Sequence, residues 1–211
     1  MKFVLFVEGK TESSGVPAFL KRWLDERLPQ RVRIAPIKFN GVSDYCGEIR
    51  KKVHLYLSAA RASDVIAGIG LLDLYGLEPA LRLPRSVKTV EQRYDWAKRE
   101  LERSVNHTGF RQHFAVHEIE AWLLSDVGIF PSEIRRDLAG TSNAPEQVNF
   151  NMPPAQLLKR AFRDRLGRRY QKAVDGPNLF RLLKPDRARS KCPYLKVMMD
   201  EMLALAENAN S

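Results

Sequence analysis

The hydrophobic positions of the chain follow two patterns that alternate along its first half. Short continuous runs of β-branched and aromatic residues are typical of strands buried on both faces of a parallel sheet. Apolar residues three or four positions apart indicate amphipathic helices. The continuous runs predict strands at 3–7, 32–39, 65–72 and 110–116. The helical spacing predicts helices at 17–28, 45–60 and 87–105.

The order of these elements is strand, helix, strand, helix, strand, helix, strand, and it predicts an open, mostly parallel sheet with helices on both faces. After Ser125 the pattern changes, because prolines divide the chain into short helices, the clearest at 154–166 and 193–205. We therefore expect a Rossmann-like α/β core over residues 1–126. A basic helical appendage over residues 127–211 is expected to pack on that core.

Acidic residues follow the ends of three predicted strands. Glu8 follows the first strand, Asp73 the third, and Glu118 and Glu120 follow the fourth. Because parallel sheets bind ligands beyond the C-terminal ends of their strands, we expect these acids to meet at one edge. Several carboxylates converge at low cost when a divalent cation pairs with them, and Mg²⁺ or Mn²⁺ prefers such oxygen ligands. The pattern therefore favours a metal site.

Two alternatives remain open for these acids. Each could instead cap a helix or a loop by accepting hydrogen bonds from backbone N–H groups. Glu118 and Glu120 would face the same way on a strand, which favours two metal ligands, but would diverge on a helix, which leaves one. Glu12 could likewise be a helix-capping acid near the start of the first helix.

The charge of the chain favours a polyanionic partner. Lys and Arg number 35 against 25 Asp and Glu, which leaves a net charge of +10, and nucleic acid is the first expectation. A solvated basic face would explain the same excess. The basic residues that we expect to bind phosphates are Lys10, Lys172, Lys184, Arg189 and Lys191. With two cysteines in no ligand spacing and no apolar stretch long enough to span a bilayer, a cytoplasmic protein without a membrane partner is expected.

Two sets of motifs carry a family resemblance. The segment Val7-Glu8-Gly9-Lys10-Thr11-Glu12, after an apolar strand, resembles the first motif of TOPRIM domains, which occur in topoisomerases, bacterial primases and overcoming-lysogenization-defect nucleases. More closely, the whole chain resembles the bacterial TOPRIM-like family of unknown function numbered 4276. The matching landmarks are Leu72 to Leu77, His117 to Asp126, Pro145-Glu146, Tyr170-Gln171-Lys172, Asp175-Gly176-Pro177 and Lys191 to Tyr194.

The resemblance implies a TOPRIM fold and a Mg²⁺-dependent nuclease that hydrolyses phosphodiesters of DNA or RNA, with DNA the first expectation. Such a nuclease could act in phage defence or DNA repair together with a separately encoded ATPase. It implies that Glu8 is a metal ligand or a general acid/base. The second motif is usually Asp-x-Asp but reads Asp73-Leu74-Tyr75 here, so Glu118 and Glu120 could replace the missing acid. Lys172 and Lys191 are expected to offset charge on the scissile phosphate. Residues expected to support the site are Glu12, Tyr75, His117 and Asp126.

The acid missing at Tyr75 favours a second hypothesis. A TOPRIM-like subunit with a degenerate metal site would bind nucleic acid or an ATPase without cutting. A phosphotransfer or small-phosphate enzyme is a third hypothesis, because acids at the strand ends of a parallel sheet also serve those reactions. The strongly basic composition disfavours it.

Overall fold

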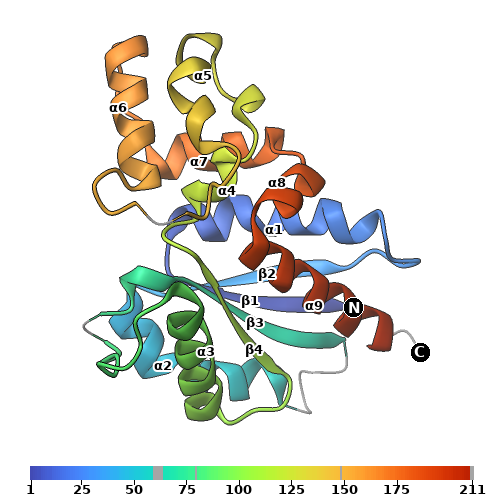
Figure 1. Cartoon of the computed structure of the whole chain (residues 1–211). Coiled ribbons are helices and arrows are strands. Elements are labelled where there is room, and N and C mark those ends of the chain that lie inside the picture. The colour runs from blue at the N-terminus through green and yellow to red at the C-terminus, as the bar shows by residue number, and fades with distance from the viewer. Residues whose placement is uncertain (59–63, 79, 148, 210–211) are drawn as a thin grey trace.

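The computed structural model describes residues 1–58, 64–78, 80–147 and 149–209, and a single parallel sheet lies at its centre (Figure 1). Its strands are β1 (Lys2–Val7), β2 (Arg33–Lys38), β3 (Val65–Asp73) and β4 (Phe110–Ala115). Their order across the sheet is β2-β1-β3-β4, and every neighbouring pair is parallel. This topology confirms the predicted α/β class with a parallel sheet.

The positions of the strands in the sheet match their sequences. The central strand β1 is buried almost throughout, as its continuous apolar run predicts. The edge strand β2 contains Pro36, opposite Leu5 of β1. A proline is tolerated there because an edge strand has one side on which no backbone N–H is needed.

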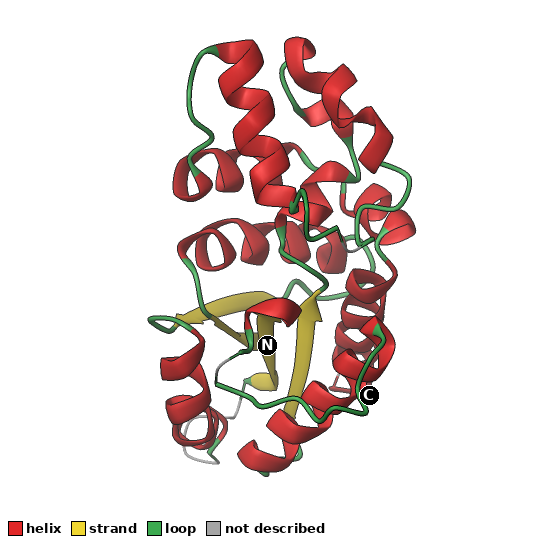
Figure 2. Ribbon diagram, turned by 60° about the vertical axis from the view of Figure 1, so that its left-hand side comes forward, coloured by secondary structure: helices red, strands yellow, loops and turns green. Residues whose placement is uncertain are grey.

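Helices cover both faces of the sheet (Figures 1 and 2). Their bounds are α1 (Lys10–Asp25), α2 (Val42–Leu57), α3 (Val90–Val105) and α9 (Pro193–Ala209). Successive side chains of β1 point to opposite faces. Phe3 and Leu5 therefore join a core with α1 and α9, whereas Val4 and Phe6 join a core with α2 and α3.

The remaining helices lie on the far side of α1 from the sheet (Figure 1). They are α4 (Glu120–Leu124), α5 (Ser132–Leu138), α6 (Pro154–Leu166), α7 (Lys172–Leu182) and α8 (Pro185–Lys191), with short 3₁₀ turns at Leu74–Gly76, Val127–Ile129 and Ala139–Thr141. Helices α7 and α8 contact α1, where Arg22 donates hydrogen bonds to the carbonyl oxygens of Phe180 (3.0 Å) and Leu183 (2.7 Å). Within the described ranges, no helix is both long and apolar enough to cross a membrane.

Several predicted helix boundaries were wrong. The first helix begins at Lys10 and not at Pro17, because its first turn is polar and shows no hydrophobic spacing. Pro17 lies inside it, and the helix ends at Asp25 and not at Leu28. The third helix begins at Val90 and not at Val87, because its N-cap residue Thr89 forms a capping box with Gln92.

The other boundaries moved by a few residues. The second helix runs from Val42 to Leu57, and its predicted end at Ala60 lies outside the described residues. The last helix extends to Ala209 and not to Leu205. The predicted helix 154–166 has the observed bounds. Strand ends differ by one residue, which is normal where terminal hydrogen bonds fray.

Candidate functional site

An acidic hollow of about 290 Å³ lies at the C-terminal ends of β1 and β3. Its lining residues come from the β1–α1 turn, the end of β3 and the start of α7, and they are Glu8, Gly9, Lys10, Thr11, Glu12, Asp73, Lys172 and Ala173. The strand-end rule thus brings Glu8 and Asp73 to one hollow, as predicted from the order of the elements.

The β1–α1 turn folds one acid back over the start of α1. Gly9 is the N-cap residue of α1, and Glu12 lies in its first turn with 7% of its surface exposed. A Cβ atom on Gly9 would lie 2.1 Å from Glu12 Oε2, so the close approach of this carboxylate requires a glycine. The positive end of the helix dipole favours an acid there.

Lys172, at the start of α7, brings a positive charge to these acids. Its Nζ atom lies 3.0 Å from Glu120 Oε2 and 4.0 Å from Glu12 Oε1. The Thr11 hydroxyl donates a hydrogen bond to the Lys172 carbonyl oxygen (2.8 Å), and a Cβ on Gly176 would lie 2.5 Å from Thr11 Cγ2. This close contact between α1 and α7 holds the lysine at the hollow.

Several carboxylate oxygens of this cluster have no hydrogen-bond partner in the described part of the chain. Among the described residues, Glu12 Oε2, Asp73 Oδ1 and Glu120 Oε1 are buried and accept no hydrogen bond. Asp73 is only partly buried as a whole residue, but its Oδ1 atom is shielded from solvent. A buried carboxylate oxygen without a partner costs free energy. The cluster therefore has more negative charge than its surroundings compensate.

The pKa shifts of the cluster follow from this imbalance. Burial raises the pKa of Asp73 well above its ordinary value and also raises the pKa of Glu120, while the Lys172 charge opposes both shifts. Burial and the neighbouring Glu12 raise the pKa of Glu8. Burial alone would lower the pKa of Lys172, but the charges of Asp73 and Glu120 outweigh it and raise that pKa. Lys172 therefore stays protonated.

The acids fit a hard divalent cation by their chemistry. Their oxygens are the ligands that Mg²⁺ prefers, and three of them have no hydrogen-bond donor within the described residues. Among the residues that the structure describes, no group of three Asp, Glu, His or Cys side chains is arranged to hold a metal ion. The Lys172 ammonium holds the position between Glu120 and Glu12. The carboxylate oxygens therefore fit Mg²⁺ by their chemistry, but in this structure they are not arranged around a common metal position.

The two acids after β4 lie apart. The strand ends at Ala115, His117 adopts a left-handed backbone with φ of 72°, and Glu120 begins α4. Glu120 is fully buried beside Lys172, whereas Glu118 Oε2 accepts a hydrogen bond from the backbone N–H of Ala155 (2.8 Å). Neither acid lies on a strand, and Glu118 is engaged at the start of α6.

The other residues expected to support the site have contacts of their own. His117 Nε2 lies 3.1 Å from the Asn149 carbonyl oxygen. Asp126 accepts a hydrogen bond from the N–H of Gly128 (3.1 Å) and pairs with Arg187 (2.6 Å). The Arg93 guanidinium lies over the Tyr75 ring, with its Cζ atom 4.4 Å from the ring centroid. The Tyr75 ring also contacts Phe150.

The expected phosphate-binding residues are dispersed. Lys10 lines the acidic hollow. Lys191 donates a hydrogen bond to the Ser125 carbonyl oxygen (3.0 Å), and Arg189 pairs with Asp200 (2.6 Å). Lys184 is exposed and precedes α8. Sequence reasoning missed Thr11 and Gly176, which hold Lys172 in place; the landmark Asp175-Gly176-Pro177 after Lys172 was the available signal.

The fold and the site together define an α/β protein with a parallel sheet and an acidic cluster at the C-terminal ends of its strands. The chain belongs to the family described as Domain of unknown function (DUF4276), which matches residues 7–203 and confirms the family predicted from the motifs.

Two solved structures are similar to the chain. The C-terminal region of the Burkholderia pseudomallei OLD protein is 16% identical, with 99% of this chain and 98% of that chain covered and a TM-score of 0.48. The C-terminal region of the Xanthomonas campestris pv. campestris OLD protein is 15% identical, with 99% and 97% covered and a TM-score of 0.43. None of the curated proteins matches the chain in sequence.

Proposed function

We propose that the protein is a Mg²⁺- or Mn²⁺-dependent nuclease that hydrolyses phosphodiesters of DNA or RNA. The observation that carries this proposal is the set of buried carboxylate oxygens without hydrogen bonds, on Glu12, Asp73 and Glu120, next to Lys172. Buried acids with raised pKa values, as at Asp73 and Glu120, are typical of sites that bind a ligand. The net charge of +10 and the resemblance to TOPRIM domains support nucleic acid as the substrate.

Each residue has a role under this proposal. Glu8, Asp73 and Glu120 would hold the cation, with Glu12 beside them. A bound divalent ion supplies positive charge that stabilises phosphate oxygens and makes bound water more acidic. Glu8, whose pKa is raised by burial and by Glu12, is a stronger base than an ordinary carboxylate and could accept a proton from water. Lys172, released from Glu120, would neutralise charge on the scissile phosphate.

Two observations favour a non-catalytic subunit that binds nucleic acid or an ATPase. The Lys172 ammonium pairs with Glu120 and approaches Glu12, so part of the acidic charge is balanced without a metal. Tyr75 also stands where the TOPRIM motif has its second acid, and its ring is engaged with Arg93. Under this alternative the acids would position Lys172 for a partner and not for chemistry.

A cleavage assay with matched variants distinguishes the two functions. The protein would be incubated with plasmid, linear and single-stranded DNA and with RNA, in Mg²⁺, Mn²⁺ or EDTA, with and without an ATPase. We expect metal-dependent cleavage that falls by about 10²-fold or more in Asp73→Asn and Glu120→Gln, because a charged ligand becomes neutral in each. Glu133→Gln, an exposed acid on α5, is the control and should cut normally.

Two results would decide against the nuclease. One is nucleic-acid binding that survives both site variants, with no cleavage under any condition. The other is cleavage that both variants retain. Calorimetric titration with Mn²⁺ gives a second readout, because Asp73→Asn should weaken metal binding whether or not the substrate offered is the right one.

A further inference from the structure

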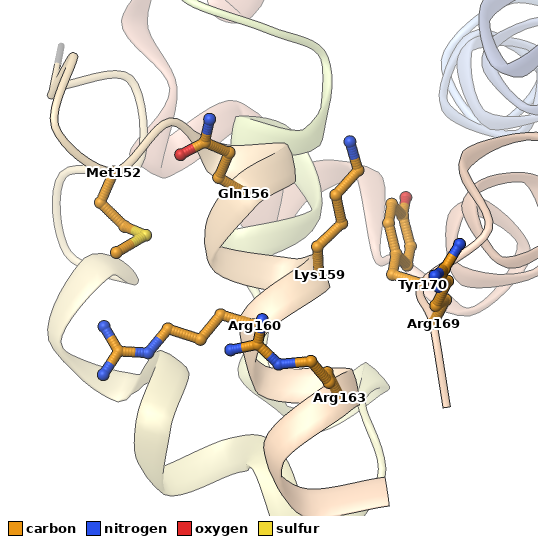
Figure 3. Close-up of a pocket in the computed structure, with 7 residues that line it drawn as sticks. All are labelled: Met152, Gln156, Lys159, Arg160, Arg163, Arg169 and Tyr170. Atoms are coloured by element: carbon orange, nitrogen blue, oxygen red, sulfur yellow. The ribbon is translucent and has the colours of Figure 1, made fainter. Parts of the chain in front are cut away.

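A second, basic hollow of about 610 Å³ lies between α6 and the segment that leads into α7 (Figure 3). Its polar lining residues are Gln156, Lys159, Arg160, Arg163, Arg169 and Tyr170. Lys159 and Tyr170 stand next to each other in the close-up, with Arg169 beside them. Four cationic side chains therefore line one concave surface.

The charges of this hollow are only partly compensated. Arg163 pairs with Asp164 (2.7 Å), and Arg160 lies 3.6 Å from the same carboxylate. In the part of the chain that is described, the side chains of Lys159 and Arg169 have no acidic partner within ion-pair distance. Arg160 and Arg163 are exposed and share the single carboxylate of Asp164, and such surface ion pairs contribute little stability. The hollow thus keeps positive charge that is available to an anion.

Tyr170 connects the basic hollow to the acidic one. Its ring packs against Phe162, with centroids 5.3 Å apart, and only 4% of the residue is exposed. Its hydroxyl has no hydrogen-bond partner among the described residues. A Cβ on Gly176 would lie 3.4 Å from this hydroxyl and 2.5 Å from Cγ2 of Thr11, which lines the acidic hollow. The two hollows are therefore adjacent.

We infer that the basic hollow binds a backbone phosphate of the nucleic-acid strand whose neighbouring phosphate lies at the acidic cluster. This inference rests on the proposed function, because the strand is the substrate of the proposed nuclease. Lys159 and Arg169 supply the positive charge that phosphate oxygens need, and the Tyr170 hydroxyl supplies a donor. Contacts of this kind set the register of a strand without reading its sequence. The hollow therefore fixes which phosphodiester reaches the acids.

A binding assay without catalysis tests the inference. Fluorescence anisotropy of labelled single- and double-stranded oligonucleotides would be measured in EDTA, where cleavage is prevented, at several salt concentrations. Lys159→Gln and Arg169→Gln should each weaken binding by roughly 3- to 10-fold and lower the slope of log K against log salt by about 1. Tyr170→Phe keeps the ring on Phe162 and should weaken binding by roughly 3-fold.

The control has the same charge change on another face of the molecule. Arg50→Gln lies on α2, is exposed and should leave both the affinity and the salt slope unchanged. Circular dichroism melting would verify that all four variants are folded. Equal losses in Arg50→Gln and in the hollow variants, or no loss in any of them, would overturn the inference.

Three further outcomes test this inference and keep it separate from the proposed function. If the protein never cuts but the hollow variants still lose affinity and salt slope, the phosphate site stands and the nuclease fails. If inorganic phosphate or pyrophosphate competes as tightly as the oligonucleotide, the hollow is a site for small phosphates and the inference is wrong. If cleavage is normal and binding is insensitive to Lys159 and Arg169, the nuclease stands and the phosphate site fails.

Discussion

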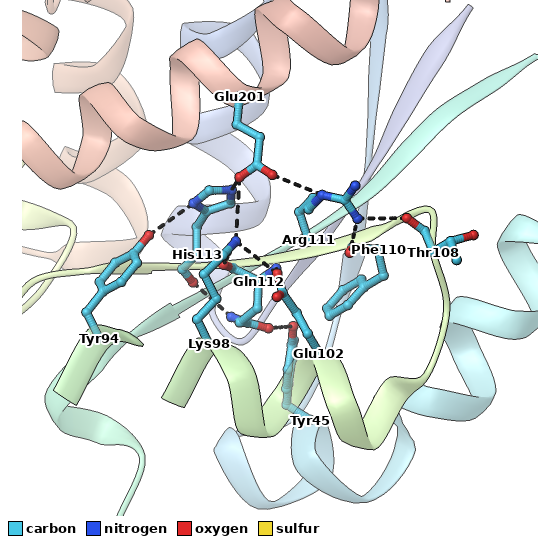
Figure 4. Close-up of polar contacts among 10 residues, drawn as sticks. All are labelled: Tyr45, Tyr94, Lys98, Glu102, Thr108, Phe110, Arg111, Gln112, His113 and Glu201. Carbon is cyan, nitrogen blue, oxygen red and sulfur yellow. Dashed lines mark hydrogen bonds and ion pairs between the residues drawn. The ribbon is translucent and has the colours of Figure 1, made fainter. Parts of the chain in front are cut away.

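Two clusters of charged residues in this molecule are built in opposite ways. Around Glu201 of α9, a single carboxylate meets several donors (Figure 4). Around Lys172 of α7, a single ammonium meets more carboxylates than it can pair with. The difference separates charges that hold the fold together from charges that are left available for a ligand.

The Glu201 cluster joins three elements. Glu201 Oε1 lies 2.9 Å from Arg111 Nε on β4, and Oε2 lies 3.0 Å from His113 Nε2 and 3.5 Å from Lys98 Nζ on α3. Tyr94 lies 3.0 Å from the other ring nitrogen of His113. These contacts attach the last helix to the edge of the sheet.

The protonation states of this cluster agree with its geometry. Burial lowers the pKa of His113, so the ring is neutral near pH 7, and it can donate to Glu201 while accepting from Tyr94. The contact with His113, followed by the charges of Lys98 and Arg111, lowers the pKa of Glu201 to about 2. A carboxylate with this many partners stabilises the folded protein, whereas the acids around Lys172 oppose it.

The largest effect is expected when the saturated cluster is broken. Glu201→Ala leaves the buried His113 and two cations without their common acceptor, so the free energy of unfolding should fall by about 2 kcal/mol, since Glu201 is partly open to solvent. For a chain of this size, the melting temperature should drop by roughly 4–8 °C. Urea unfolding at pH 7 measures the change.

The pH dependence of this effect has a definite sign. The folded pKa of Glu201, about 2, lies below its ordinary value of 4.5, so its contribution is complete above about pH 4.5 and is lost as the pH falls toward 2. The difference between wild type and Glu201→Ala should therefore shrink in acid. Exposed Glu133→Gln is the control. A change below about 0.5 kcal/mol at pH 7 would contradict the assigned role, because that is the usual range for surface substitutions.

The opposite change is expected at the unsaturated cluster. Asp73→Asn removes a charge that burial and its acidic neighbours disfavour, so in EDTA the free energy of unfolding should rise by about 1 kcal/mol at pH 8. Because the folded pKa of Asp73 is raised, wild type gains stability as the pH falls through that pKa toward the ordinary value of 3.8. The advantage of Asn should therefore disappear in acid.

Added metal should reverse this result. A ligand that binds only the folded state stabilises it in proportion to the logarithm of its concentration over Kd, so Mn²⁺ should raise the stability of wild type and leave Asp73→Asn unchanged. Thermal melting with a Mn²⁺ titration makes the comparison. Destabilisation of Asp73→Asn at pH 8 in EDTA would show that the carboxylate is structural and would remove the contrast with Glu201.

The sequence is sufficient to predict one part of the acidic cluster. The apolar runs identify strands, parallel topology brings their ends together, and Glu8 and Asp73 follow those ends directly. Whether Glu118 or Glu120 completes the group depends on where β4 stops. The left-handed backbone at His117, which turns the chain into α4, has no signal in hydrophobic spacing.

The other part depends on contacts between distant segments. Thr11 and Lys172 are 161 positions apart, and no periodicity encodes their hydrogen bond. Arg189 was expected to bind phosphate, yet it is partly buried and pairs with Asp200 of the neighbouring helix, which packs beside it. Counting basic residues therefore identifies a basic region but not the contacts that each residue makes.

The smallest expected effect concerns the turn that brings Glu12 to Lys172. Gly9 has an extended backbone, with φ of −108° and ψ of 175°, that alanine also adopts, so Gly9→Ala should not strain the chain. The new Cβ would lie 2.1 Å from Glu12 Oε2, and the flexible carboxylate must swing away. Stability should change by about 0.5 kcal/mol at most.

The displacement of Glu12 should nevertheless be measurable at the acidic cluster. Removal of one carboxylate from the surroundings of Lys172 should weaken Mn²⁺ binding several-fold in a calorimetric titration, while the unfolding curve barely moves. Gly47→Ala on α2 is the matched control, because nothing lies within 4 Å of its new Cβ. That control should gain stability from the better helix propensity of alanine, by about 0.5–1 kcal/mol, with unchanged metal affinity. Equal metal affinities for wild type and Gly9→Ala would place Glu12 outside the group of acids that the cation contacts, with Glu8, Asp73 and Glu120 as the remaining ligands.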